Sequence, residues 1–263
     1  MQENKKFKIV TSKRTRYILP NIITLAGVCL GISSIKFSLD QNFSLAVIFI
    51  LLAAILDALD GRIARLISGT SEFGKELDSL TDFVSFGIAP AFIIYFWDLN
   101  NYGKIGWAIT LIYSVCCVLR LARFNLTKID SKESWKENYF QGIPSPIGAI
   151  LILTPITFEL TNFENVLNLK PITPYLMVVI SILLISKFPS FSFKKIKISS
   201  KFTIFILFII GLLFVSLMFF TFETLFIFSM IYILTIPVAL YSYNKSKKNF
   251  KDLLSEEEHE DVI

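Results

Sequence analysis

Eight long apolar stretches constrain this chain more than any other feature of its sequence. They cover approximately residues 18–37, 43–66, 79–97, 105–122, 143–160, 172–188, 202–220 and 224–242. Each is close to the roughly 20 residues that an α-helix needs to cross the hydrocarbon core of a bilayer. A soluble domain of 263 residues has no interior large enough for 26 Phe beside so many Leu and Ile. Because the backbone must satisfy its own hydrogen bonds in lipid, the stretches predict an all-α integral membrane protein with about eight transmembrane helices.

The positions of Lys and Arg predict how these helices are oriented. Of the 26 basic residues, 21 fall in residues 1–17, in alternate loops or in residues 243–263. The opposite side receives Lys36, Lys104 and Lys170. The remaining two basic residues, Arg62 and Arg65, lie at the end of the second stretch. By the positive-inside rule both termini then face the cytoplasm, which predicts a multi-pass protein of the inner (plasma) membrane. The first stretch lacks an obvious cleavage site of small residues, so we interpret it as a retained helix.

The sequence divides into four parts. Residues 1–17 form a basic N-terminal segment, and residues 18–188 form the transmembrane core that carries the charged motifs of the chain. Residues 189–242 add two transmembrane helices after a basic loop. Residues 243–263 form a polar, cytoplasmic tail whose acidic end predicts disorder.

Four aspartates lie where the second apolar stretch ends and the third begins. Asp57 and Asp60 are three residues apart, and Asp78 and Asp82 are four apart, so each pair lies on one face of its helix. An ionised group at the centre of a membrane helix costs roughly 2.5–3.5 kcal/mol, less near the interface. Two facing helices would direct the four carboxylates to one point, where hard oxygen ligands suit Mg²⁺ or Mn²⁺ bound to phosphate.

Two other interpretations of the aspartates stay open. One is that they form structural salt bridges with Arg62 and Arg65, although two arginines cannot neutralise four aspartates. The other is a cation or proton pathway in a transporter, which also uses buried carboxylates. The chain shows no obvious pair of matching halves, and the carboxylates crowd into residues 57–82, which favours a metal site.

The spacing of these residues resembles the signature of the CDP-alcohol phosphotransferase family. The pattern is Asp57-x₂-Asp60-Gly61-x₂-Ala64-Arg65-x₈-Gly74-x₃-Asp78-x₃-Asp82, and no signature position departs from it. The resemblance implies a homodimer and a six-helix catalytic core, here extended by two C-terminal helices. It implies two divalent ions, Mg²⁺ or Mn²⁺, and Asp82 as the general base that deprotonates the acceptor hydroxyl. The implied metal ligands are Asp57, Asp60, Asp78 and Asp82. The implied CDP-binding residues are Asp60, Gly61, Ala64, Arg65, Gly74 and Asp78.

Four further stretches, residues 19–24, 79–90, 119–125 and 140–149, resemble the bacterial phosphatidylserine synthases of this family. The resemblance implies phosphatidyl transfer from CDP-diacylglycerol to L-serine, giving phosphatidylserine and CMP. We expect the site on the cytoplasmic side, in contact with membrane lipid, and no nucleic-acid partner. Within the family the alternative acceptor is glycerol 3-phosphate or inositol. Outside it the alternatives are a cation-coupled transporter and a non-catalytic scaffold.

Arg120 and Arg123 are three residues apart and share a helical face at the end of the fourth stretch. Guanidinium groups bind phosphate or carboxylate through two parallel hydrogen bonds, so we expect one or both to bind the lipid phosphate or the serine carboxylate. The other interpretation is a topogenic charge that reaches the interface. Residues 142–146 contain two prolines and predict a fixed start of the fifth stretch. That start shapes the alcohol pocket, uses Ser145 as a helix cap, or does both.

Overall fold

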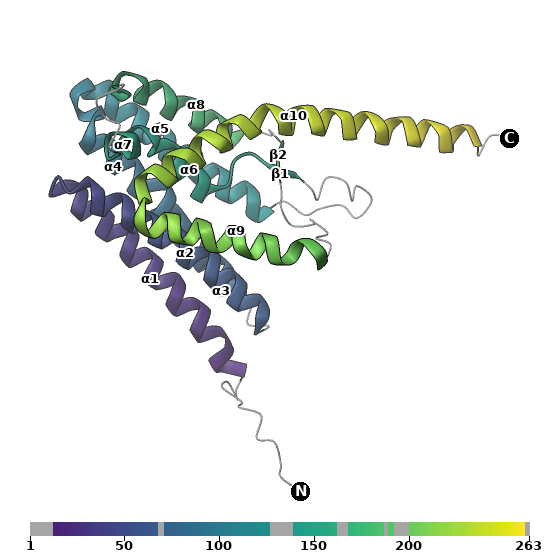
Figure 1. Cartoon of the computed structure of the whole chain (residues 1–263), viewed down its shortest axis with the longest axis horizontal. Coiled ribbons are helices and arrows are strands. Elements are labelled where there is room, and N and C mark those ends of the chain that lie inside the picture. Colours follow the sequence, from purple (N-terminus) through teal and green to yellow (C-terminus); the bar gives the residue numbers. More distant parts are fainter. Residues whose placement is uncertain are drawn as a thin grey trace, which may run out of the picture.

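The computed structural model describes residues 13–67, 71–126, 139–161, 168–186, 189–191 and 200–260. The helices are α1 (Lys13–Leu39), α2 (Phe43–Leu66), α3 (Glu72–Asp82), η1 (Phe83–Ile88), α4 (Ala89–Trp97), η2 (Leu99–Tyr102), α5 (Gly103–Leu126), α6 (Ser145–Ile152), α7 (Thr154–Glu159), η4 (Lys170–Ile172), α8 (Thr173–Ile185), α9 (Ser200–Phe219) and α10 (Thr221–Glu260). A short antiparallel ribbon pairs β1 (Tyr139–Gln141) with β2 (Pro189–Phe191). The helices up to α8 form a bundle, and a hairpin of α9 and α10 lies along one side of it (Figure 1).

Within the described residues, five helical stretches are long and apolar enough to cross a membrane. They are Ile18–Leu39, Phe43–Leu66, Glu72–Trp97, Leu99–Leu126 and Thr221–Tyr243. Two further apolar helices, Lys170–Ile185 and Leu207–Phe219, are shorter. The predicted all-α membrane protein is confirmed, whereas the predicted count of eight spans is not.

The predicted fifth span is divided into two short helices. Helix α6 ends at Ile152 and α7 begins at Thr154, with Leu153 between them. Pro155 lies in the first turn of α7 and has no backbone N–H, so the α-helical hydrogen bond to Leu151 is missing there. Hydropathy does not change at this point, and the interruption comes from the proline.

The helix that carries Asp78 and Asp82 begins earlier than predicted. The apolar stretch begins at residue 79, but α3 begins at Glu72, where the Ser71 side chain accepts a hydrogen bond from the Gly74 N–H over 2.9 Å. Such a cap satisfies one of the free N–H groups of the first turn. Asp78 and Asp82 therefore both lie inside one helix, a single turn apart.

Helices α1 and α2 pack against each other as an antiparallel hairpin. The connection turns at Gln41, whose φ is 59°, and Asn42 caps α2 by accepting a hydrogen bond from the Leu45 N–H. Because the two helices run in opposite directions, the start of α1 lies beside the end of α2. This arrangement brings Thr24 next to Asp60.

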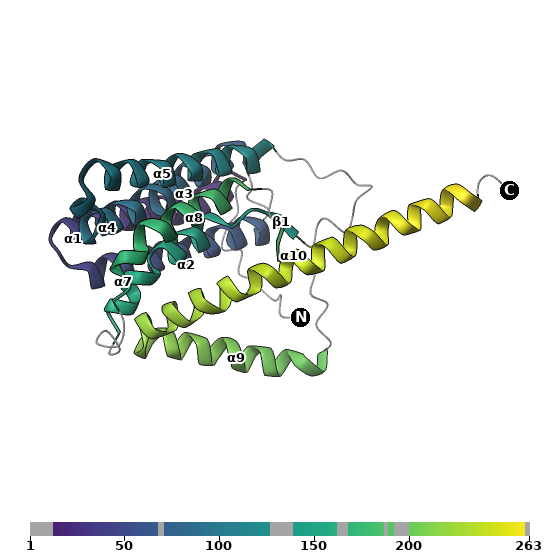
Figure 2. The same ribbon diagram turned by 90° about the horizontal axis from the view of Figure 1, so that it is seen from above.

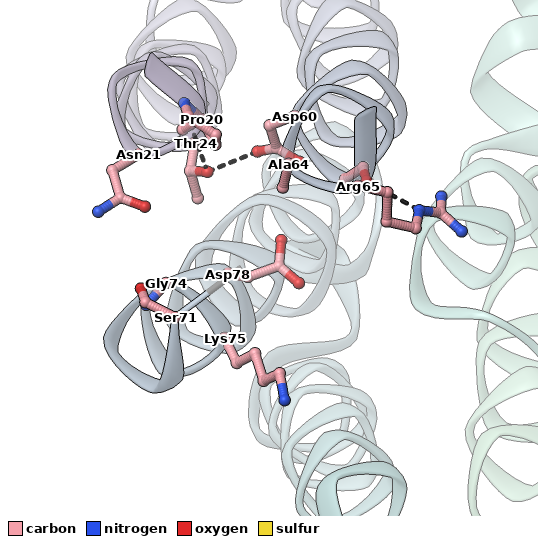
Figure 3. A pocket seen from close by; sticks show the side chains of 11 residues that line it. Pro20, Asn21, Thr24, Asp60, Ala64, Arg65, Ser71, Gly74, Lys75 and Asp78 are labelled. Atoms are coloured by element: carbon pink, nitrogen blue, oxygen red, sulfur yellow. Dashed lines mark hydrogen bonds between the residues drawn. The ribbon is translucent and has the colours of Figure 1, made fainter. Parts of the chain in front are cut away.

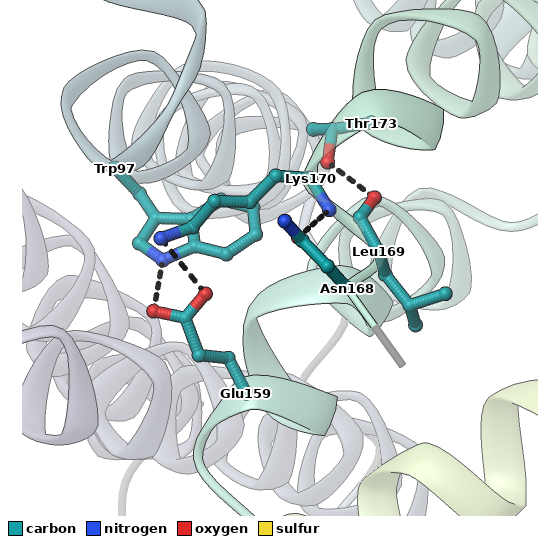
Figure 4. A network of polar contacts seen from close by, with 6 residues as sticks. All are labelled: Trp97, Glu159, Asn168, Leu169, Lys170 and Thr173. Carbon is teal, nitrogen blue, oxygen red and sulfur yellow. Dashed lines mark hydrogen bonds and ion pairs between the residues drawn. The ribbon is translucent and has the colours of Figure 1, made fainter. Parts of the chain in front are cut away.

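A polar network joins three helix ends at the other end of the bundle (Figure 4). Trp97 Nε1 donates a hydrogen bond to Glu159 Oε1 over 3.3 Å, and Lys170 Nζ lies 3.0 Å from Glu159 Oε2. The Lys170 ammonium also lies over the Trp97 ring, 5.2 Å from its centroid. Burial raises the pKa of the neighbouring Asp98 carboxyl, and Lys170 counteracts part of that rise. The network fixes the end of α4 to the end of α7 and to η4, which directly precedes α8.

The C-terminal tail is helical as far as Glu260, so the predicted disorder of its acidic end is wrong for residues 255–260. Residues 244–260 contain no Gly or Pro and are rich in Lys, Glu and Leu, which favour helix. Helix α10 therefore continues well beyond the bundle (Figure 2). A charged composition alone does not distinguish a disordered tail from a helix.

Candidate active site

A cleft of about 190 Å³ opens between α1, α2 and α3. Asp60 of α2 and Asp78 of α3 face one another across it (Figure 3). All six residues that the resemblance implies for CDP binding line this cleft, although their role toward CDP stays a prediction. The lining also includes five residues outside the predicted set, namely Pro20, Asn21, Thr24, Ser71 and Lys75.

The predicted metal ligands come together where α2 and α3 meet. Carboxylate oxygens of Asp57, Asp60 and Asp78 all lie within 4.8 Å of one another. Asp82 lies close enough to Asp57 and Asp78 for their charges to interact, and its Oδ1 is buried with no hydrogen-bond partner among the described residues. Buried carboxylates that repel each other are costly unless a cation or hydrogen bonds compensate them. This donor set fits a divalent metal ion, and its role as a metal site stays a prediction.

Thr24 orients one of these carboxylates. Its hydroxyl lies 2.6 Å from Asp60 Oδ2 and 3.0 Å from the carbonyl oxygen of Pro20. Both Thr24 and Asp60 are buried, so water does not compete strongly for this bond. The only signal for Thr24 in the sequence is weak: residues 19–24 belong to the stretches that resemble relatives, but the spacing of Thr24 from Asp60 carries no information.

Two glycines shape the cleft in different ways. A Cβ built at Gly61 would meet nothing within 4 Å, so this side of α2 is open to the cleft. A Cβ at Gly74 would lie 3.1 Å from Ser71 Oγ and 3.2 Å from Asn21 Oδ1, so α3 approaches α1 closely there. A side chain at Gly61 would occupy part of the open cleft, whereas one at Gly74 would press on two polar groups of the lining.

The interpretation of the aspartates as partners of Arg62 and Arg65 is wrong. In the described part of the chain, neither arginine forms an ion pair with an aspartate. Arg65 Nε instead donates a hydrogen bond to the Gly61 carbonyl oxygen of its own helix over 2.9 Å. The cost of the clustered carboxylates is therefore not offset by these two side chains.

Arg120 and Arg123 share a helical face but have different partners. Arg120 donates from Nη1 to Ser145 Oγ, and its charge acts on Asp57 and Asp82. Its Nε is buried with no hydrogen-bond partner among the described residues. Arg123 donates to the carbonyl oxygens at the end of α8, including that of Ser186 over 3.2 Å. Of the pair, Arg120 is the one directed toward the aspartates.

One interpretation of residues 142–146 predicted that Ser145 caps α6, and this interpretation is wrong. The N-cap position is Pro144, which makes no side-chain cap hydrogen bond. The Ser145 hydroxyl is fully buried and is used by Arg120 instead. The predicted fixed start of this helix is confirmed, since Gly142 has a φ of 79° and Pro146 lies in the first turn.

Comparison with known proteins identifies the family of this chain. Residues 17–186 match the CDP-alcohol phosphatidyltransferase family. A CDP-diacylglycerol--serine O-phosphatidyltransferase of Mycobacterium tuberculosis is 31% identical over 226 residues, which are 86% of this chain and 79% of the relative. One of Helicobacter pylori is 35% identical over 194 residues, 74% of this chain and 80% of the relative. An archaetidylserine synthase of Methanothermobacter thermautotrophicus is 34% identical over 177 residues, 66% of this chain and 70% of the relative. The match includes the whole acidic cluster and both arginines of α5, and the chain belongs to the CDP-alcohol phosphatidyltransferase family.

Proposed function

We propose that this chain transfers the phosphatidyl group of CDP-diacylglycerol to L-serine, giving phosphatidylserine and CMP. The observation that carries the proposal is the group of four carboxylates between α2 and α3, with the Arg120 charge directed toward it. The names of the relatives support serine as the acceptor, because several are CDP-diacylglycerol--serine O-phosphatidyltransferases.

Asp57, Asp60, Asp78 and Asp82 are the residues that would hold divalent metal, and we expect two ions of Mg²⁺ or Mn²⁺. Their support is the proximity of three carboxylates and the unpartnered Oδ1 of Asp82. Such ions, when bound, neutralise the pyrophosphate and stabilise the charge that develops on the leaving group. Thr24 holds Asp60 in the direction of this cluster.

The CDP group would occupy the cleft lined by Asp60, Gly61, Ala64, Arg65, Gly74 and Asp78. The open space beside Gly61 supports this location, because a ligand can approach the backbone of α2 there. Lys75 also lines the cleft and adds a positive charge that suits a pyrophosphate. The diacylglycerol chains would remain in the bilayer beside the bundle.

Asp82 is the general base in this proposal. The serine hydroxyl oxygen attacks the phosphorus that carries diacylglycerol, and its proton passes to Asp82. The bond between this phosphorus and the oxygen of CMP breaks, and CMP leaves with the electron pair. The unpartnered Oδ1 of Asp82 supports this role, because a base must have a lone pair free to accept the proton.

Arg120 would bind the anionic group of the acceptor. Its buried Nε has no partner among the described residues, and its Nη1 is held by Ser145, so the guanidinium is fixed and still has a donor to offer. This favours an acceptor with a carboxylate or phosphate, such as serine or glycerol 3-phosphate, over uncharged inositol. Arg123 is engaged by carbonyl groups at the end of α8, so its contribution to the acceptor site would be indirect.

The position of the site in the membrane is also part of the proposal. The distribution of Lys and Arg supports cytoplasmic termini and a site that opens to the cytoplasm, where serine and CMP are soluble. Family resemblance supports a homodimer in the inner membrane. Both expectations are independent of the identity of the acceptor.

The test is CMP release by the purified, detergent-solubilised protein with CDP-diacylglycerol and Mn²⁺ or Mg²⁺. Serine, glycerol 3-phosphate and inositol are compared, and Asp82→Asn is expected to abolish turnover while the protein stays folded. Asp40→Asn is the matched control, because Asp40 is exposed and paired with Lys36 at the opposite end of α1 from the cleft. CMP release with another alcohol would refute serine as the acceptor, and substantial activity of Asp82→Asn would remove Asp82 as the base. No release with any alcohol would favour the transporter interpretation.

A further inference from the structure

The helix that carries Asp78 and Asp82 contains a π turn directly after Asp82. This turn, η1, covers Phe83–Ile88, and at its end the Ala89 N–H donates to the Val84 carbonyl oxygen, five residues back. π turns are rare in proteins and occur frequently at functional sites. An interruption of the α-helical pattern at this position separates the segment with the aspartates from the apolar segment α4.

Pro90 explains why a side chain must enter this turn. Pro90 has no backbone N–H, so the Phe86 carbonyl oxygen lacks its ordinary α-helical donor. The hydroxyl of Tyr113 on α5 donates to that oxygen over 2.9 Å. Tyr113 and Phe86 are both completely buried, so a water molecule has no access to the carbonyl. In a membrane helix such freed backbone groups must be satisfied by neighbouring helices.

The turn is also held by α1 and by a second residue of α5. Ser114 Oγ donates to the Gly87 carbonyl oxygen, and Ser85 Oγ donates to the Gly27 carbonyl oxygen of α1, both over 3.2 Å. Gly31 allows this approach, because a Cβ there would lie only 2.8 Å from Ser85 Oγ. The turn is thus fixed from two sides, and its conformation depends on contacts made far away in the sequence.

We propose that Tyr113 is a positioning residue for catalysis, whose hydroxyl replaces the donor missing at Pro90 and thereby sets the direction in which Asp82 is presented. The inference rests on the proposed role of Asp82. One residue more or less in a helical turn rotates the preceding segment of the helix by about 100° relative to the segment after the turn. Helix α4 is anchored in the core, so a change in the turn is transmitted to α3 and its carboxylates.

The same face of α5 also carries Arg120, seven residues or about two helical turns after Tyr113. Between them Cys117 Sγ lies 3.7 Å from Ser145 Oγ, the oxygen that receives Arg120. Helix α5 therefore supports the proposed base through Tyr113 and also carries the proposed acceptor-binding residue Arg120, which Ser145 of α6 holds. A change at Tyr113 alone is expected to affect the base and to spare the acceptor contact.

The first experiment is steady-state kinetics of Tyr113→Phe, which removes one hydroxyl and keeps the ring. We expect kcat to fall roughly tenfold, the rate equivalent of one buried hydrogen bond, with KM for serine and CDP-diacylglycerol within about twofold. Thr110→Val is the matched control, because the Thr110 hydroxyl is buried on the same helix but donates to its own helix at Gly106. An unchanged kcat in Tyr113→Phe would refute the inference. So would a fall in kcat that only tracks the loss of folded protein.

The second experiment restores the missing donor with Pro90→Ala. The backbone N–H of residue 90 can then donate to the Phe86 carbonyl oxygen, so in this background Tyr113→Phe should lower kcat by less than about threefold. A double-mutant cycle measures this non-additivity. Additive effects would refute the inference.

Mn²⁺ affinity without substrates, measured by electron paramagnetic resonance, gives a readout independent of turnover. Tyr113→Phe should weaken it, and unchanged affinity together with unchanged kcat would leave the proposed function standing while this inference fails. Substantial activity of Asp82→Asn would instead remove Asp82 as the base, the role on which this inference rests, and absence of CMP release by the wild type would refute the proposed function itself.

Discussion

Thr24→Val removes the hydroxyl that donates to Asp60 and leaves a side chain of almost the same shape. The bond is 2.6 Å long and ends on a carboxylate oxygen, and both residues are about 95% buried. We expect the change to loosen Asp60 and so to weaken the binding of divalent metal. The protein should stay folded, because no cavity is created.

The magnitude depends on the kind of bond that is lost. A hydrogen bond to a charged group contributes about 1.5–3 kcal/mol, and every 1.4 kcal/mol is about a factor of ten in affinity. The concentration of Mn²⁺ that gives half-maximal activity should therefore rise roughly 10- to 100-fold. Screening by solvent does not reduce this range much, because Asp60 is almost fully buried.

The assay is CMP release at saturating substrates over a series of Mn²⁺ concentrations. Thr24→Val should recover most of its activity at high Mn²⁺, whereas Thr24→Ser, which keeps the hydroxyl, should need less than about three times the wild-type concentration. Thr110→Val controls for the loss of a buried threonine hydroxyl elsewhere. Equal Mn²⁺ requirements for Thr24→Val and the wild type would refute the role of Thr24.

Two further predictions separate residues by their partners. Arg120→Lys should raise KM for serine about tenfold with little change in KM for CDP-diacylglycerol. Arg123→Lys should mainly lower the melting temperature, because Arg123 donates hydrogen bonds to carbonyl groups at the end of α8. The reverse pattern would show that Arg123 binds the acceptor. Glu159→Gln removes the half-exposed pair with Lys170 and should lower the free energy of unfolding by at most about 1 kcal/mol without changing kcat, measured by thermal unfolding and CMP release. A large loss of activity would connect the far end of the bundle to the site.

The general architecture could be predicted because lipid imposes it on the sequence. Long apolar stretches can only be helices in a bilayer, and the spacings of three and four residues place Asp57 with Asp60 and Asp78 with Asp82 whatever the tertiary structure. Hydropathy alone could not give the number of spans. Pro155 divides a stretch whose hydropathy is continuous, and α3 begins at Glu72, in a polar segment, because Ser71 caps it.

Contacts between helices could not be predicted, because spacing within one helix does not identify the helix that faces it. Arg120 and Arg123 share a face and could not be distinguished by their spacing, yet one is held by Ser145 and the other by the carbonyl end of α8. The contact of Tyr113 with η1 is a clearer example of a contact between helices that spacing cannot predict. Pro90 predicts a carbonyl without a donor, but the donor comes from a residue 23 positions later, on a helix packed against the turn. A proline in a membrane helix therefore predicts that a partner exists, and the packed structure is needed to identify it.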